Sequence, residues 1–113
     1  MDEKQQKGVA SELIAEYYLT RAGYFVYTKK SVQSAVDLVA INPKTGEVLL
    51  VDVKTASLRK TGDKKGTTIR RVLSKEQKKL GVNLLYVYEN KTCELIKYEN
   101  KNIVRKILNE VLY

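Results

Sequence analysis

Histidine is absent from this chain of 113 residues, and cysteine occurs only once. Without histidine the chain cannot build Ser-His-Asp or Cys-His nucleophilic centres, a nuclease site whose general base is histidine, or a zinc site based on imidazole. A lone Cys93 forms no internal disulfide, so a reducing cytoplasm is the expected compartment. The strong metal ligands that are left are carboxylates, which select hard cations such as Mg²⁺ or Mn²⁺.

Long apolar runs are also missing. No stretch approaches the roughly 20 apolar residues that a membrane span needs, and the N-terminus is polar rather than signal-like, so no membrane contact is expected. With 43% hydrophobic and 30% charged residues, the composition is that of a globular protein. We expect residues 1–113 to form a single domain, which at this size buries roughly 65% of its unfolded surface.

Basic residues outnumber acidic ones, 21 to 13, for a net charge of +8. A small domain with this excess favours a polyanionic partner, most often nucleic acid. The plain alternative is a basic protein whose charge serves only solubility.

The hydrophobic pattern predicts an α/β domain. Helical periodicity covers residues 3–22 and stops at Gly23, and a capping-box signature starts a second helix at Ser74 that ends near Gly81. The apolar face of residues 101–112 predicts a third, C-terminal helix, made of Ile103, Val104, Ile107, Leu108, Val111 and Leu112. Strands are expected at residues 24–28, 35–41, 48–53, 82–88 and 93–98, and residues 67–73 are expected to return briefly to the sheet.

Two acidic residues interrupt the apolar strands at 35–41 and 48–53. The segment between these strands contains Pro43 and Gly46, which indicates a β-hairpin. If its turn is centred between residues 44 and 45, Asp37 faces Asp52, and Lys54 points to the same side. Two opposed carboxylates in apolar strands are costly unless a cation lies between them, and a divalent metal is the natural candidate. The structural alternative is a buried Asp–Lys ion pair that holds the hairpin.

These residues resemble the core of the PD-(D/E)xK nuclease superfamily, in which an Asp on one strand faces an Asp/Glu-x-Lys on the next. Further segments make the chain most similar to archaeal-type Holliday-junction resolvases and their phage relatives, over about residues 7–88. These segments are Gly8-Val-Ala-Ser-Glu12, Gly23-Tyr-Phe-Val-Tyr27, Val36-Asp-Leu-Val-Ala40, Val51-Asp-Val-Lys-Thr55 and Ser74-Lys-Glu-Gln77.

The resemblance implies a restriction-endonuclease-like αβββαβ core with a mixed central sheet, followed here by the C-terminal helix. It also implies that Asp37 and Asp52 bind Mg²⁺, for which Mn²⁺ substitutes, with the Val53 carbonyl as a further ligand. Glu12 would bind or orient a second metal or its water. Lys54 would then orient the attacking water and stabilise charge in the transition state.

Some assignments stay open at this point. Glu16, one turn after Glu12, has the same ligand chemistry and is the alternative helical carboxylate. Some resolvases use a serine upstream of the first aspartate, and Ser31 and Ser34 are both available.

Residues 59–71 form a basic segment that begins five residues after Lys54, so it should emerge at the rim of the predicted site. We expect it to bind phosphate, the alternative being a solvated, mobile loop. Its basic residues are Arg59, Lys60, Lys64, Lys65, Arg70 and Arg71. Gln77, in the first turn of the second helix, either contacts DNA or the catalytic face or serves only the capping box.

The sequence therefore predicts a metal-dependent endonuclease that cleaves branched DNA of the Holliday type as a homodimer, with an interface on the C-terminal helix or with that helix simply covering the sheet. The alternatives are a structure-selective or restriction-like nuclease on other DNA, a non-catalytic nucleic-acid-binding module of the same fold, and a basic subunit of a larger machine.

Overall fold

The computed structural model describes residues 1–99 and 102–108. In this part of the chain two helices and six strands follow one another: α1 (Glu3–Arg21), β1 (Phe25–Thr28), β2 (Leu38–Ile41), β3 (Val48–Thr55), α2 (Lys75–Leu80), β4 (Val82–Val87), β5 (Cys93–Glu99) and β6 (Asn102–Ile107). Neither of the two helices combines the length and the apolar character needed to cross a membrane.

Both helices begin at capping boxes. At α1, Asp2 Oδ1 accepts a hydrogen bond from the Gln5 backbone N–H at 2.8 Å, while Gln5 returns one to the Asp2 N–H. Ser74 and Gln77 make the same reciprocal pair at α2, which ends at Gly81 with a left-handed φ of 76°. These contacts satisfy backbone donors that a helix start otherwise leaves unpaired, and they confirm both predicted helices.

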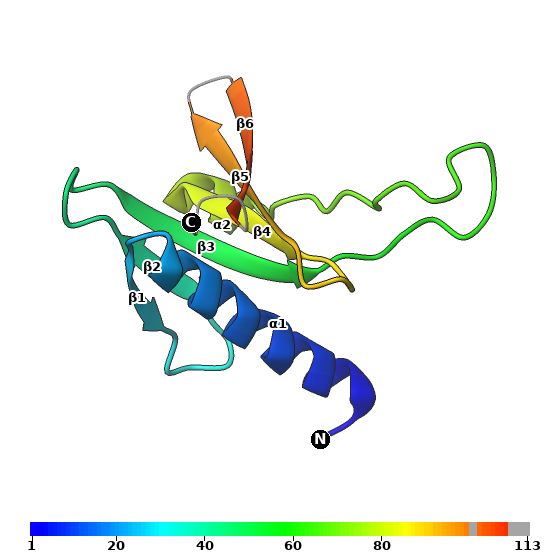
Figure 1. Cartoon of the computed structure of the whole chain (residues 1–113), viewed down its shortest axis with the longest axis horizontal. Coiled ribbons are helices and arrows are strands. Elements are labelled where there is room, and N and C mark those ends of the chain that lie inside the picture. The colour runs from blue at the N-terminus through cyan, green and yellow to red at the C-terminus, as the bar shows by residue number, and fades with distance from the viewer. Residues whose placement is uncertain (100–101, 109–113) are drawn as a thin grey trace.

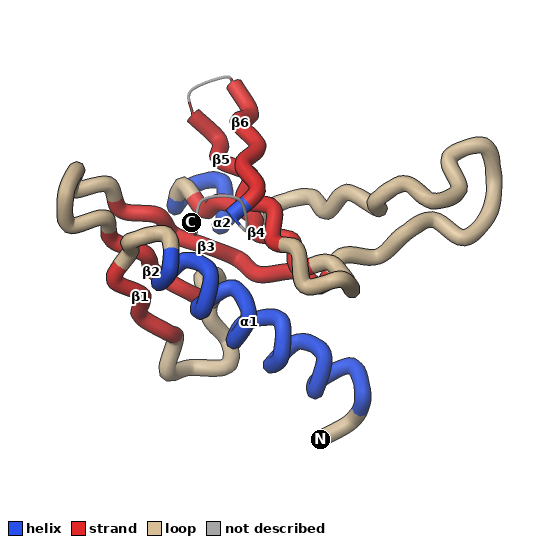
Figure 2. Tube along the Cα trace, viewed as in Figure 1, coloured by secondary structure: helices blue, strands red, loops and turns tan. Residues whose placement is uncertain are grey.

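The strands form one sheet in the order β1-β2-β3-β4-β5-β6 (Figures 1 and 2). Neighbouring strands are antiparallel except β3 and β4, which are parallel, so the sheet is mixed as predicted. In the β2–β3 hairpin Val39 pairs with Leu50 and Ile41 pairs with Val48, which confirms the predicted register.

The two faces of the sheet carry separate apolar clusters. Helix α1 packs Ala15 and Leu19 onto the face that includes Val51 and Leu85. Alternate residues of β4, such as Leu84, point to the opposite side, where α2 lies (Figure 1). The central strands are therefore covered on both sides, which suits their nearly continuous apolar sequence.

The predicted C-terminal helix is wrong for the residues that the structure describes. Asn102–Ile107 forms β6, which runs antiparallel to β5 with Ile96 opposite Arg105. A run rich in β-branched residues fits a strand well, and β5 would otherwise expose unpaired backbone groups along its edge. Two residues of the predicted apolar helix face, Val111 and Leu112, lie outside the described residues.

Residues 67–73 do not return to the sheet either. The strand-like contact in this region is an isolated bridge between Leu58 and Thr68, within the long connection from β3 to α2. This connection, residues 56–73, is called the basic arm below. It extends well away from the sheet (Figure 1).

Candidate active site

The two predicted carboxylates meet at the centre of the sheet. Asp37 directly precedes β2, and its backbone N–H donates to the Val51 carbonyl at 2.9 Å, so the hairpin pairing continues to this residue. Its Oδ2 accepts a hydrogen bond from the Val53 N–H at 2.8 Å. Asp52 lies opposite in β3, and both residues are buried, at 8% and 6% exposure. The hairpin thus places two acidic side chains in contact inside an apolar sheet.

Lys54 lies on the same side as Asp52. Its Nζ is 3.4 Å from Asp52 Oδ2, while about a third of the lysine side chain stays exposed. That Oδ2 atom is buried and has no hydrogen-bond donor within the described part of the chain. A buried carboxylate oxygen that accepts no hydrogen bond is unusual and suits a cation, a place that the Lys54 ammonium partly fills here.

Lys29 is a member of the site that the sequence analysis missed. Its Nζ is 2.5 Å from Asp37 Oδ1 and 3.8 Å from Glu12 Oε1. Its backbone N–H also donates to the Asp37 carbonyl at 3.1 Å, which extends the β1–β2 pairing by one residue. Pairing strand 24–28 with strand 35–41 at the sequence level would have placed Lys29 opposite Asp37.

Glu12 reaches this cluster from α1 through Lys29, and this contact favours Glu12 over Glu16 as the helical carboxylate of the site. Burial raises the pKa of Glu12, as does the negative charge of Asp37, while Lys29 opposes the shift. The described residues contain no group of three or more acidic or cysteine side chains placed to hold a metal together. Asp37 and Asp52 are the two carboxyls in direct contact, and Glu12 joins them through Lys29.

The paired carboxyls differ in proton affinity. For Asp37, burial acts to raise the pKa, but hydrogen bonds from Lys29, from Asp52 and from the Val53 N–H together lower it. Burial raises the pKa of Asp52, and its hydrogen bond to Asp37 adds to this rise, while Lys54 opposes it. Asp52 therefore keeps a proton to higher pH than Asp37, as expected for two close carboxyls of which one holds the stronger cation.

Gln77 makes contacts beyond its capping box. Besides completing the α2 capping box, its Nε2 donates to the Ala35 carbonyl at 3.1 Å. Its amide also acts to lower the pKa of Asp52. Of the two upstream serines, Ser34 accepts a hydrogen bond from the Val36 N–H in a local turn, and Ser31 is exposed.

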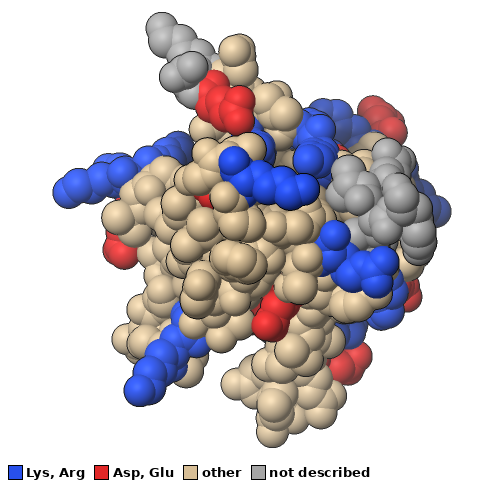
Figure 3. All heavy atoms as spheres, turned by 60° about the vertical axis from the view of Figure 1, so that its left-hand side comes forward, with Lys and Arg blue, Asp and Glu red and all other residues tan. Residues whose placement is uncertain are grey.

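The basic arm is a hydrogen-bonded hairpin rather than an irregular loop. Its two sides are joined from the Arg59 N–H to the Thr67 carbonyl and from the Ile69 N–H to the Ser57 carbonyl, both at 2.8 Å. All residues of the tip between Gly62 and Gly66 are exposed. Basic side chains are spread over the face seen in Figure 3 rather than gathered in one patch. In the sequence, the arm holds six basic residues between positions 59 and 71.

The base of the arm is tied to β4 and β5. The Arg71 N–H donates to the Tyr86 hydroxyl at 2.7 Å, and Tyr86 is in register with Lys54. Arg70 forms a 3.0 Å ion pair with Glu94 and lies over the Tyr86 ring. Arg70 is thus engaged by Glu94, although it is exposed like Arg59, Lys60, Lys64, Lys65 and Arg71.

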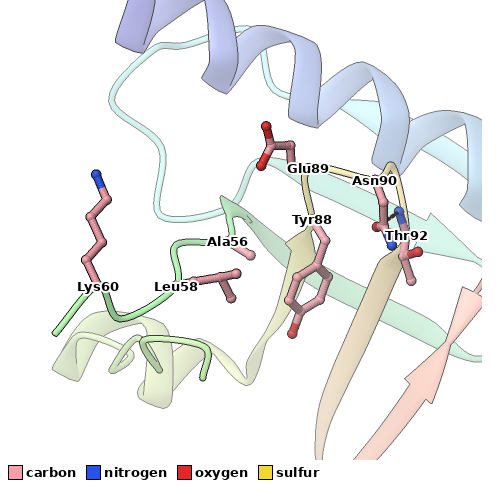
Figure 4. Close-up of a pocket in the computed structure, with 7 residues that line it drawn as sticks. All are labelled: Ala56, Leu58, Lys60, Tyr88, Glu89, Asn90 and Thr92. Carbon is pink, nitrogen blue, oxygen red and sulfur yellow. Dashed lines mark hydrogen bonds between the residues drawn. The ribbon is translucent and has the colours of Figure 1, made fainter. Parts of the chain in front are cut away.

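A pocket of about 690 Å³ opens where the arm leaves the sheet. Leu58 points toward the Tyr88 ring, and Glu89 points toward α1 (Figure 4). Ala56, in its wall, comes two residues after Lys54 and so continues the same side of the strand. The Ala56 wall of the pocket therefore lies about 7 Å beyond Lys54 along the strand direction and about 13 Å beyond Asp52.

Comparison with solved structures shows that the fold is shared with a known protein. A solved bacterial homing endonuclease, I-Ssp6803I, is similar with a TM-score of 0.65 at 16% identity, and the similarity covers 94% of this chain and 78% of that one. No protein-family model matches the chain.

In sequence, the chain is similar to Protein 5.3 of Escherichia phage T7, with 43% identity over 67 residues. That match covers 58% of this chain and 55% of the phage protein, so the chain spans about half the length of this curated relative.

Proposed function

We propose that the chain is a metal-dependent endonuclease of the PD-(D/E)xK type that hydrolyses DNA phosphodiesters. The observation that carries this proposal is the buried pair of Asp37 and Asp52 with Lys54 beside it, including an Asp52 Oδ2 that accepts no hydrogen bond within the described residues. A fold shared with a homing endonuclease and the net charge of +8 support it.

In this proposal Asp37 and Asp52 hold Mg²⁺ or Mn²⁺. A bound divalent ion would supply Lewis-acid activation of water and neutralise charge at the scissile phosphate. Lys54, next to Asp52 and partly exposed, would orient the attacking water and stabilise negative charge as it develops. Glu12 would orient water from the α1 side, and the exposed residues of the basic arm would bind the phosphates on either side.

The proposed substrate is branched DNA, cut by a homodimer. This part rests on the similarity of the motifs to junction resolvases and on the geometry of the reaction. One centre cuts one strand, and resolving a four-way junction takes two matched cuts related by two-fold symmetry, which a cyclic dimer provides. The helix predicted as an interface is replaced by β6 over Asn102–Ile107, so the dimer is proposed without an assigned surface.

A second candidate is an endonuclease that acts on duplex DNA, because the structural neighbour is a homing endonuclease. Cleavage of duplex, flap and four-way junction DNA in Mg²⁺, with light scattering at micromolar protein, separates the two. A dimer that prefers junctions supports the resolvase. A monomer that cuts duplex as well as junction DNA would support a nuclease that is not a resolvase.

The site itself is tested with Asp37→Ala, Asp52→Asn and Lys54→Ala. Each should lower the cleavage rate at least about a hundredfold while DNA binding persists, because metal or water positioning is lost. Lys44→Ala, in the exposed hairpin turn, is the charge-matched control for Lys54→Ala and should cleave normally. Near-normal cleavage by Asp37→Ala would refute the assignment of the active site to Asp37 and its neighbours. DNA binding without metal-dependent cleavage by the unmodified protein would make it a binding module.

A further inference from the structure

Lys29 holds the carboxylate cluster together from within. Its ammonium lies 2.5 Å from Asp37 and 3.8 Å from Glu12, and its side chain is only 24% exposed. The hydrogen bond to Asp37 raises the pKa of Lys29, and the charges of Asp37, Glu12 and Asp52 add to this rise against the effect of burial. All three acidic side chains of the candidate site therefore act on this one cation.

This position conflicts with metal binding at Asp37. Asp37 Oδ2 is already used by the Val53 N–H, so Oδ1 is the oxygen better placed to serve as a ligand, and Lys29 occupies it. Mg²⁺ binds carboxylate oxygens at about 2.1 Å, so a divalent ion on Oδ1 would lie no more than about 4.6 Å from the ammonium. Like charges at that separation repel strongly in a partly buried site.

Lys54 presents a weaker conflict. Its ammonium lies 3.4 Å from Asp52 Oδ2, further than Lys29 lies from Asp37, and its side chain is 37% exposed, so it reaches the carboxylate from the solvent side. Lys29, by contrast, has its backbone fixed by the 3.1 Å hydrogen bond to the Asp37 carbonyl. Only the side chain of Lys29 would have to move, and it would stay beside the site after moving.

We propose that Lys29 is the resident counter-ion of this site: its ammonium must leave Asp37 before that carboxylate binds a divalent ion, so Lys29 sets the metal affinity. The proposal rests on the proposed metal-dependent function. Lys29 acts here as a positioning residue. It balances Asp37 and Glu12 in the metal-free protein and competes with the metal for Asp37.

The test is titration of DNA-free protein with Mn²⁺ by calorimetry at neutral pH. Lys29→Met should bind Mn²⁺ at least about tenfold more tightly, because it removes the competing charge and nearly preserves the length of the side chain. Lys29→Arg, which keeps the cation, should show no such gain. Lys30→Met makes the same charge change at the next residue, which is exposed, and should stay within about threefold of the unmodified protein.

A second readout separates competition from simple damage to the fold. Without metal, Lys29→Met should melt at a lower temperature than the unmodified protein, because Asp37 and Glu12 lose their counter-ion. Saturating Mn²⁺ should then raise the melting temperature of Lys29→Met by more than it raises that of the unmodified protein. A merely structural lysine would give the lower melting temperature without the larger rise.

The outcomes distinguish this proposal from the function on which it rests. If the unmodified protein binds Mn²⁺ and Asp52→Asn does not, but Lys29→Met binds equally or more weakly, the counter-ion role is refuted and the metal site stands. If neither the unmodified protein nor Lys29→Met binds Mn²⁺, both the metal site and the counter-ion role fail.

Discussion

The basic arm allows a sharp test, because its six basic residues are not equivalent. Lys64 and Lys65 are exposed at the tip, whereas Arg70 is paired with Glu94. In duplex DNA each phosphate contact contributes about 0.9 to the slope of log K against log salt. The double variant Lys64→Ala/Lys65→Ala should therefore flatten the slope by about 1.8. The loss of affinity relative to the unmodified protein should then be about twelvefold smaller at 200 mM salt than at 50 mM salt.

Replacement of Arg70 and Arg71 by alanine should have a smaller effect on the slope. Both arginines are exposed, but Arg70 is paired with Glu94, whereas Arg71 has no ion pair within the described residues, so we expect a flattening of about 0.9. This differs from the sequence-level expectation, which treats the two arginines like the tip lysines. Breaking the pair with Glu94 should also loosen the arm and weaken binding at every salt concentration.

Fluorescence anisotropy with labelled duplex, in the absence of divalent metal to prevent cleavage, measures both slopes. Lys44→Ala/Lys30→Ala removes two exposed charges elsewhere and should leave the slope nearly unchanged. If the two arm variants flatten the slope equally, Arg70 contacts phosphate despite its ion pair with Glu94. An unchanged slope for Lys64→Ala/Lys65→Ala would show that the arm does not contact DNA.

Three further predictions concern stability. Asp52→Asn should stabilise the metal-free protein by about 1 kcal/mol near pH 7, seen as a higher melting temperature, because it removes a buried carboxylate whose pKa is raised by burial. The pKa of Glu47 is lowered, chiefly by its hydrogen bond from Lys97, so Glu47→Gln should cost about 0.5–1 kcal/mol at pH 7. This cost should vanish in denaturant titrations as the pH falls below 4.5 and through the lower folded-state pKa, since the ionised form alone is stabilising. Tyr86→Phe removes the acceptor for the Arg71 N–H and should speed its hydrogen exchange about fivefold, whereas unchanged protection would show that the arm is anchored elsewhere.

The sequence predicts those parts of the fold that local rules determine. The α2 helix follows from Ser74, Gln77 and Gly81, which are close in sequence and act on the same backbone groups. The contact between Asp37 and Asp52 follows from turn residues that fix the hairpin register, and from the period of two along a strand. Each of these inferences needs no knowledge of more distant segments.

The features that were predicted wrongly or not at all depend on which segments pair with one another, and the hydrophobic pattern of the sequence does not reveal that pairing. Ile103 and Ile107 fit one face of a helix, but this segment forms a strand instead, because it pairs with the otherwise open edge of β5. Lys29 looks like an ordinary lysine after a short strand until β1 is paired with β2. The arm looks like a loop because its pairing partners, such as Leu58 and Thr68, carry no alternating pattern.

The parallel pairing of β3 with β4 has a consequence for the order of folding. A parallel pair requires a long crossover, and here that crossover contains the basic arm and α2. The β2–β3 hairpin closes over a short turn, so its loop-closure entropy is small and it should form early, bringing Asp37 to Asp52. The pairing of Lys54 with Tyr86 must wait for the crossover to dock. We therefore expect Asp37 and Asp52 to be brought together, and to repel one another, at a stage of folding when the arm is not yet anchored. Mutations that relieve that repulsion, such as Asp52→Asn, should then speed folding more than they slow unfolding.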